Sequence, residues 1–345
     1  MDGNTVVSSV PLFYNCLVSK ETSKGILKNR SIQFLFCAAS DKKGMDISMY
    51  SSRKKACVYL IITFLLWGSL YVVSKSVLNK LPVFTTAFFR YLIAFITLSV
   101  ILSSKKIVLP EKKDWKYFFV LGFLGYTVSV NAQLIGTKLA GASMASLINA
   151  LNPVAITLAG AVILREKLTK YKTGGILVSL LGVYAILGSG SAENPAGILF
   201  SLFAVLIWSV SSVLVRKISQ KYDSLLITWI AIGMAVILNM PVGIGELYAK
   251  RSVINVDMSC VCGLLFMGIF CTGISYMLWN KSLSLMDAGI CSSFYPLQPL
   301  TAACLGAIFF KEKITASFLL GAFFIVCGMV ISLHSPDAKH RSHRQ

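Results

Sequence analysis

The sequence predicts an all-α integral membrane protein with ten transmembrane helices in two inverted five-helix repeats. Two observations support this fold class. The chain is 56% hydrophobic and only 14% charged, with a mean hydropathy of +0.73, which leaves too little polar surface for a water-soluble globule of 345 residues. A stretch of the first half also recurs in the second half at a constant spacing.

The apolar segments have the length that a helix needs to cross about 30 Å of hydrocarbon. We place ten of them near residues 57–78, 84–102, 117–137, 143–164, 171–188, 197–215, 225–245, 260–280, 288–310 and 315–333. The connections between them are short and leave no room for a folded domain outside the membrane. We therefore expect the protein to act within the bilayer.

The repeat is clearest in the fourth and fifth segments of each half. Residues 151–183 align without a gap on residues 297–329, at an offset of 146, and nine of the 33 pairs are identical. Ordinary residue frequencies would give about two identities. Two copies with an odd number of helices each must point in opposite directions across the bilayer, and such inverted repeats are typical of transporters. Matched small residues, such as Gly182 and Gly328, are expected to let helices pack closely.

The charge distribution orients the chain. The net charge of +19 could suggest a nucleic-acid partner, but lysine and arginine concentrate in alternate connections. This bias predicts a multi-pass protein of the plasma (inner) membrane with both termini in the cytoplasm and no nucleic-acid partner. We divide the chain into a tail (1–55), a first repeat (56–190), a second repeat (191–334) and a basic cytoplasmic tail (335–345).

The N-terminal tail differs in composition from the rest. Its apolar stretch at residues 31–40 is too short for a signal peptide and is followed by charged residues rather than a cleavage site. Met45 and Met49 both stand just before the basic start of the first segment. We expect the tail to be disordered or to belong to an over-long start.

Several short patterns recur in the same order in both halves. The first half carries Trp67-Gly68-Ser69, Pro82 followed by Arg90, and Pro153 leading to Arg165-Glu166-Lys167; the second half carries Trp208, Pro299 and Lys311-Glu312-Lys313. In this order and duplication, residues 55–333 resemble the EamA-type family of the drug/metabolite transporter superfamily. The resemblance implies a permease or exporter of a small metabolite, amino acid or drug-like molecule. The second half has no arginine equivalent to Arg90.

Acidic residues are absent from the middle of every predicted helix. All fourteen lie in tails, connections or helix ends, and the three histidines follow the last segment. Transporters that exchange a proton for a cation commonly use a buried carboxylate or histidine. We therefore expect a neutral, zwitterionic or anionic substrate, moved by facilitated exchange or by coupling at a site that this pattern does not reveal.

The prolines of the fourth and ninth segments indicate a pocket. Pro153 and Pro299 each remove a backbone donor and free the carbonyl four residues earlier, at Asn149 and Tyr295. Polar and aromatic residues at comparable depth complete the expected substrate-binding set: Trp67, Asn131, Gln133, Asn149, Asn152, Trp208, Tyr276, Tyr295 and Gln298. The alternative is that prolines and amides serve packing between helices and that tryptophans anchor at the interface.

A second group is expected to act in gating or structure: Arg90, Pro153, Glu166, Pro299 and Glu312. Arg90 lies about 9 Å into its helix, where it can snorkel outward, pair with a helix-end glutamate or bind a substrate carboxylate. We favour a structural role for it. Glu166 and Glu312 occupy matched junctions at helix ends, so we expect ion pairs that cap or gate.

An enzyme is disfavoured. The sequence contains no H-E-x-x-H or G-x-S-x-G motif, and the cysteines are expected to pack as small hydrophobes rather than bind metal. We expect no catalytic residue, metal or cofactor. The expected partners are a small-molecule substrate and the lipid bilayer, with a homodimer left open. The predicted function is secondary transport by alternating access, and the alternative is a non-transporting membrane scaffold or sensor.

Overall fold

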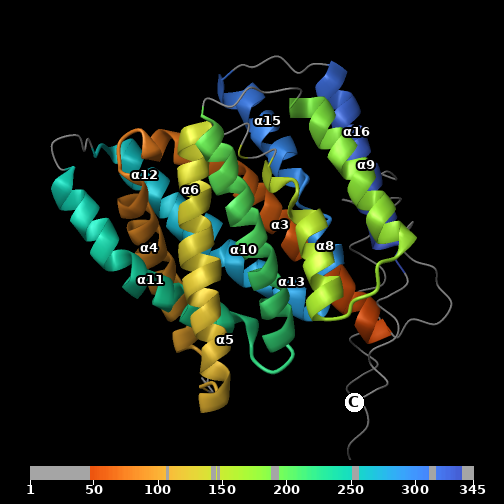
Figure 1. Cartoon of the computed structure of the whole chain (residues 1–345), viewed down its shortest axis with the longest axis horizontal. Coiled ribbons are helices and arrows are strands. Elements are labelled where there is room, and N and C mark those ends of the chain that lie inside the picture. The colour runs from red at the N-terminus through yellow and green to blue at the C-terminus, as the bar shows by residue number, and fades with distance from the viewer. Residues whose placement is uncertain are drawn as a thin grey trace, which may run out of the picture. The chain divides into compact units, whose positions relative to one another are not determined.

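The computed structural model describes residues 47–105, 109–140, 145, 148–187, 194–250, 256–310 and 316–335. Within these ranges every regular element is a helix and no strand occurs (Figure 1). The first helix begins at Ile47, inside the range that we assigned to the N-terminal tail. The rest of that tail, and the C-terminal tail beyond Ser335, lie outside the described residues.

The helices of the first half follow the predicted segments. They are α3 (Ile47–Leu78), α4 (Val83–Ser103), the continuous run of η1 (Lys112–Asp114), α5 (Trp115–Val120), η2 (Leu121–Val128) and α6 (Ser129–Ala140), then α8 (Asn152–Ile163) and α9 (Lys170–Leu187).

The second half has the same order of elements. Its helices are α10 (Pro195–Ile218), α11 (Ser224–Ala249), the continuous run of α12 (Met258–Phe266), η4 (Met267–Ile274) and α13 (Ser275–Leu285), then α14 (Ala288–Ser292), α15 (Leu297–Phe310) and α16 (Ala316–Leu333). Each of the ten predicted ranges therefore contains helical residues.

Six helices of the described part are long and apolar enough to cross a membrane. They span Ser52–Leu78, Val83–Ser103, Lys112–Ala140, Pro195–Ile218, Ser224–Ala249 and Met258–Leu285. The shorter apolar helices include Asn152–Ile163, which follows an interruption in the fourth predicted segment. These lengths define a multi-pass membrane protein.

Acidic side chains at helix ends satisfy backbone donors. The side chains of Asp223 and Asp257 accept hydrogen bonds from the first turns of α11 and α12, at 2.9 Å in both cases. Glu246, near the end of α11, accepts from the backbone N–H groups of Phe84 and Thr85 at the start of α4, at 2.8 and 3.1 Å. The free N–H groups of a helix start need such acceptors, and they carry the positive end of the helix dipole.

A π-helical stretch occurs at the same place in each half. η2 and η4 begin at Leu121 and Met267 and end at Val128 and Ile274, so both bounds differ by 146, the offset of the sequence repeat. The wider turn of a π-helix displaces backbone carbonyls from the helical ladder. The Cys271 carbonyl in η4 accepts a hydrogen bond from Trp67 Nε1 at 3.0 Å. The duplication is thus visible in the backbone as well as in the sequence.

The last helices of the two halves, α9 and α16, pack side by side (Figure 1). Gly175 lies against Gly328, and Gly182 lies against Gly321. Because residues 175 and 321 are one repeat apart, as are residues 182 and 328, each half contributes the same pair of glycines to the contact. A side-chain carbon at Gly182 would lie only 2.6 Å from the Gly321 carbonyl oxygen. The small residues therefore allow close approach, as expected.

Other helix contacts between the halves come in exchanged pairs. α3 packs on α13 and α15, while α10, its counterpart in the second half, packs on α6 and α8. In the same way α4 packs on η4 while α11 packs on η2. These contacts of α3 and α4 are matched by contacts of α10 and α11 with the halves exchanged, as in a two-fold pseudosymmetric pair.

Candidate functional site

The fourth and ninth predicted segments are interrupted at matched positions. Turns lie at residues 150–151 and 293–296, just before α8 and α15. Pro153 and Pro299 are the second and third residues of the helices that follow, rather than interior residues of continuous helices as we expected. The first turn of a helix accommodates proline because its N–H groups have no partner within the helix.

The carbonyls that precede these prolines are already bonded. The Asn149 carbonyl accepts from Asn152 Nδ2 at 2.9 Å, and the Tyr295 carbonyl accepts from the Gln298 backbone N–H at 2.9 Å. Both carbonyls therefore have a hydrogen-bond partner within the protein. The interruptions instead bring the side chains of Asn149, Tyr295 and Gln298 to one cavity.

This cavity is formed by side chains from both halves. Its lining residues are Trp67, Leu70 and Tyr71 of α3, Arg90 of α4, Ser129 and Gln133 of α6, Asn149 before α8, Ala204 and Trp208 of α10, Tyr276 of α13, Tyr295 in the turn before α15, and Gln298 of α15. Seven of the nine side chains predicted to bind substrate line it.

Aromatic rings form one wall of the cavity. The ring centroid of Trp67 lies 5.9 Å from that of Trp208 and 5.5 Å from that of Tyr276, in edge-to-face arrangements. Trp208 Nε1 donates to the hydroxyl of Tyr295. Because these polar edges are hydrogen-bonded within the protein, the rings present mainly apolar surface to a ligand.

Amide groups form the polar part of the lining. Gln133 Nε2 donates to the Tyr71 hydroxyl at 3.2 Å, and Asn149 Nδ2 donates to the Ala145 carbonyl at 3.0 Å. The side-chain amide of Gln298 makes no hydrogen bond to any residue that the structure describes. Gln298 therefore has both its donor and its acceptor available for a ligand.

Two predicted residues lie elsewhere. Asn131 is buried and donates to Asn239 Oδ1 of α11 at 2.6 Å. Asn152 is buried and donates to both the carbonyl and the side-chain oxygen of Asn149. They match the alternative in which membrane amides bond across or along helices. Asn152 helps to hold Asn149 in place rather than lining the cavity itself.

The four lining residues that the sequence analysis missed follow a simple rule. Leu70 and Tyr71 are three and four residues after Trp67, Ser129 is four residues before Gln133, and Ala204 is four residues before Trp208. Residues three or four apart share one face of a helix. A search one helical turn before and after each predicted residue would have included all four.

Arg90 is buried, with 1% of its surface exposed, and lines the cavity. Its Nε donates to the Thr272 hydroxyl of η4, and an NH2 group donates to the Tyr276 hydroxyl at 3.3 Å. Its guanidinium carbon lies 5.9 Å from the centre of the Tyr276 ring. No carboxylate of the described residues lies within 4 Å of it. Of the three roles considered, the structure does not support snorkelling or pairing with glutamate.

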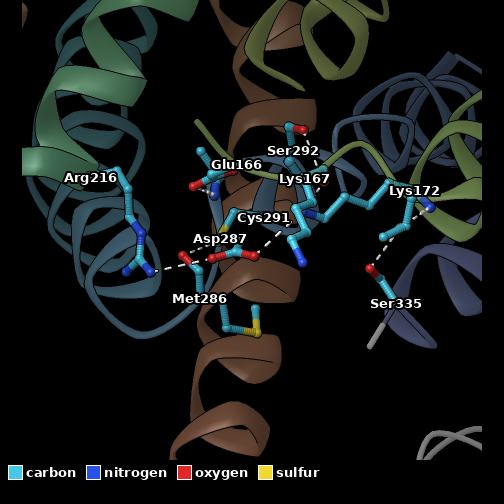
Figure 2. Close-up of polar contacts among 12 residues, drawn as sticks. Glu166, Lys167, Lys172, Arg216, Met286, Asp287, Cys291, Ser292 and Ser335 are labelled. Atoms are coloured by element: carbon cyan, nitrogen blue, oxygen red, sulfur yellow. Dashed lines mark hydrogen bonds and ion pairs between the residues drawn. The ribbon is translucent and has the colours of Figure 1, made fainter. Parts of the chain in front are cut away.

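A cluster of charged side chains lies at the end of the bundle where α8 and α10 end and α14 begins (Figure 2). Asp287 accepts from Lys172 Nζ and from Arg216 NH2, both at 3.4 Å. Glu166 Oε1 accepts from the Ala288 backbone N–H at 3.4 Å. We call Glu166, Lys172, Arg216 and Asp287 the charge cluster. It joins the α8–α9 connection of the first half to α10 and α14 of the second.

A tight helix end positions Glu166. The backbone N–H groups of Leu164 and Glu166 both donate to the Gly160 carbonyl, at 3.0 and 3.1 Å, and Arg165 between them has φ 55°. This left-handed residue reverses the chain at the helix end, a position where glycine is usual. Burial, with a smaller effect from the nearby Asp287 carboxylate, raises the pKa of Glu166. Glu312, its repeat counterpart, lies outside the described residues.

Apolar spanning helices, a cavity lined by both halves and a charge cluster at one end together define a multi-pass membrane transporter. The sequence profile of the EamA-like transporter family matches residues 54–188 and 195–333. The chain belongs to this family, and it is a transporter rather than an enzyme.

Curated relatives are similar over nearly their whole length. An "Uncharacterized transporter" of Archaeoglobus fulgidus is 24% identical over 284 residues, which cover 81% of this chain and 97% of the relative. The "Uncharacterized transporter YetK" of Bacillus subtilis is 26% identical, covering 82% and 89% of the two chains. A "Probable amino-acid metabolite efflux pump" of Salmonella typhimurium is 23% identical, covering 82% and 95%.

A solved crystal structure supports the fold. It superimposes with a TM-score of 0.68 at 21% sequence identity, covering 80% of this chain and 97% of the other. At this identity the similarity concerns the fold alone.

Proposed function

We propose that the protein is a secondary transporter that moves a small metabolite, amino acid or drug-like molecule by alternating access between two inverted five-helix halves. The observation that carries the proposal is a cavity lined by side chains from both halves. The exchanged helix contacts also fit two halves of the same fold that pack against each other. Rocking of one inverted half against the other would open the cavity to each side of the membrane in turn.

Two layers close the cavity toward the start of α3. Phe64 and Trp279 are 0% and 1% exposed, and Phe64 lies 4.7 Å from Tyr295 of the lining, centroid to centroid. Beyond them, Arg216 lies eight residues after Trp208, and Asp287 eight residues before Tyr295, so the charge cluster forms a second layer. We propose that the charge cluster is a gate and that the structure represents the state closed at this end.

We assign this end to the cytoplasm. The start of α3 carries Arg53, Lys54 and Lys55, and positive residues favour the cytoplasmic side. With this orientation both termini are cytoplasmic, and we propose the plasma (inner) membrane as the location. Cysteines introduced singly at Lys54 and Lys138 should be labelled from opposite sides by an impermeant maleimide, and labelling of both from one side would overturn this topology.

The opposite end cannot form the same gate. At the repeat offset of 146, the counterparts of Asp287 and Lys172 are Gly141 and Phe318, which carry no charge. A transporter with inverted halves therefore cannot form the Asp287–Lys172 ion pair at its opposite end.

Counterflow in proteoliposomes tests the proposed function. A panel of labelled amino acids, other small metabolites and drug-like molecules is offered to vesicles preloaded with each unlabelled compound. Exchange that saturates with concentration identifies a carrier. A purified, folded protein that binds members of the panel yet exchanges none of them would instead be a non-transporting scaffold or sensor.

Gln298→Ala then tests the cavity as the binding site. Its amide is available to the substrate, and a lost hydrogen bond costs about 0.5–1.5 kcal/mol. We expect the half-saturation concentration to rise about two- to tenfold. Gln220→Ala, the same change in the exposed turn after α10, is the matched control. Equal exchange by wild type and Gln298→Ala would exclude Gln298 from the substrate site. The relative named as an amino-acid metabolite efflux pump supports the choice of panel.

A further inference from the structure

We propose that the cavity takes a substrate that carries an anionic group, such as a carboxylate, and that the Arg90 guanidinium binds this group. This inference rests on the proposed function, because it names the substrate class of the same cavity. It excludes small molecules whose only charge is positive.

The first argument is the burial of an uncompensated charge. Arg90 lies on α4, a membrane-spanning helix, and is 1% exposed. A buried ion loses several kcal/mol of hydration, and in membranes such ions normally pair with an opposite charge. The hydrogen-bond partners of Arg90 in the described part of the chain are two neutral hydroxyls, on Thr272 and Tyr276. Neither partner carries a negative charge, so the described part of the chain places no anion beside Arg90.

The second argument is the charge of the cavity lining. Arg90 is the basic residue among the twelve lining residues, and none of the twelve is acidic. An anion that enters the cavity meets one fixed positive charge and no fixed negative charge. The positive charge attracts this anion and would repel a cation. Both effects are strong in surroundings of low dielectric.

The third argument is the donor capacity of the guanidinium. Its five N–H groups form a planar fork that matches the two oxygens of a carboxylate. Thr272 and Tyr276 accept from two of these groups. The remaining donors suit a bidentate contact, and a charge-assisted bond of this kind is about twice as strong as a neutral one.

The other lining residues indicate what the uncharged part of the substrate is like. Trp67, Trp208 and Tyr276 provide apolar faces for a ring or hydrocarbon body. The free amide of Gln298 provides one donor and one acceptor for a polar group. A compact molecule with a carboxylate at one end and an apolar body fits this arrangement, whether or not it also carries an amino group.

The test uses three probes of similar size: phenylacetate, phenylacetamide and phenethylamine, which are anionic, neutral and cationic at neutral pH. The unfolding midpoint of the detergent-purified wild type is measured with increasing concentrations of each. We expect saturable stabilisation by phenylacetate, with at least tenfold weaker effects of the other two. Equal stabilisation by all three, a preference for phenethylamine, or no stabilisation by phenylacetate would overturn the proposal.

Variants assign the effect to Arg90. Arg90→Gln should weaken phenylacetate binding about tenfold to a hundredfold, and Arg90→Lys, which keeps the charge, should weaken it less. Lys138→Gln removes the same charge from an exposed position on α6 and should leave binding unchanged. If Arg90→Gln fails to fold, the comparison of the three probes on wild type still decides the proposal.

The outcome is separable from that of the proposed function. Counterflow of a neutral compound without phenylacetate binding would support the proposed transport function and overturn the proposed anion site. Phenylacetate binding through Arg90 without counterflow of any panel member would support the anion site and overturn the proposed transport function.

Discussion

Replacing Asp287 with alanine tests whether the charge cluster holds one end of the transporter closed. Asp287 accepts from both Lys172 and Arg216, and the Lys172 side chain is only 1% exposed. Without this carboxylate, the two cations keep only Glu166, among the described residues, as a nearby acidic group and remain close together. The change should therefore destabilise the state closed at this end relative to the state in which these groups separate into water.

The size of the effect follows from burial. Removing one partner of a buried ion pair costs about 3–5 kcal/mol. Asp287 and Arg216 keep 15% and 16% exposure, so solvent offsets part of the loss and we expect the low end, about 3 kcal/mol. This corresponds to a shift of about a hundredfold in the equilibrium between closed and open states.

Cys291 provides a native reporter. It lies one turn after Asp287 on α14 and is 0% exposed, so a thiol reagent reaches it only when this end opens. In a variant whose other cysteines are replaced by serine or alanine, the rate of reaction with N-ethylmaleimide measures the open fraction. We expect this rate to rise by up to about a hundredfold in Asp287→Ala.

Glu111→Ala is the control, because its ion pairs with Lys113 and Lys221 are solvent-exposed and such pairs contribute little. It should leave the Cys291 rate unchanged. An Asp287→Ala protein with a lower unfolding midpoint but an unchanged Cys291 rate would refute the reasoning, since the cluster would then stabilise the fold without gating access.

Two further predictions concern the gate and the contact between halves. Because the pKa of Glu166 is raised above its ordinary value of 4.5, the folded protein binds this proton more tightly than the unfolded chain, and its contribution to stability falls as pH rises from about 4.5 through the raised pKa. The unfolding midpoint of wild type minus that of Glu166→Gln should decrease across this window; a constant difference would contradict the prediction. Gly182→Ala should cost about 1–3 kcal/mol by overpacking α9 against α16, whereas Gly174→Ala on the same helix, with open space around it, should be neutral or stabilising. Equal unfolding midpoints for these two variants would show that the glycine contact is not close.

Hydropathy and the repeat offset were sufficient to predict the helical segments, because the thickness of the hydrocarbon fixes the length of a spanning helix. The same offset relates the π-helical stretches, which no periodicity argument had indicated. The prolines were predicted to lie inside continuous helices, whereas the structure interrupts both segments just before them. Proline determines which backbone carbonyl loses its helical partner. The group that then bonds this carbonyl depends on nearby side chains, such as that of Asn152.

The sequence alone determined which residue types are available at the depth of the cavity: aromatic rings, amides, one arginine and no carboxylate. Only the tertiary structure decided which of them face it. Asn131 turns to Asn239 of α11, and Arg90 turns to Thr272 and Tyr276, partners more than 100 residues away in each case. The tertiary structure also brought Lys172 and Arg216 to Asp287, and Glu166 to the Ala288 backbone N–H. The physical reason is that hydropathy records burial in the bilayer, whereas the rotation of each helix about its axis is set by packing against helices distant in sequence.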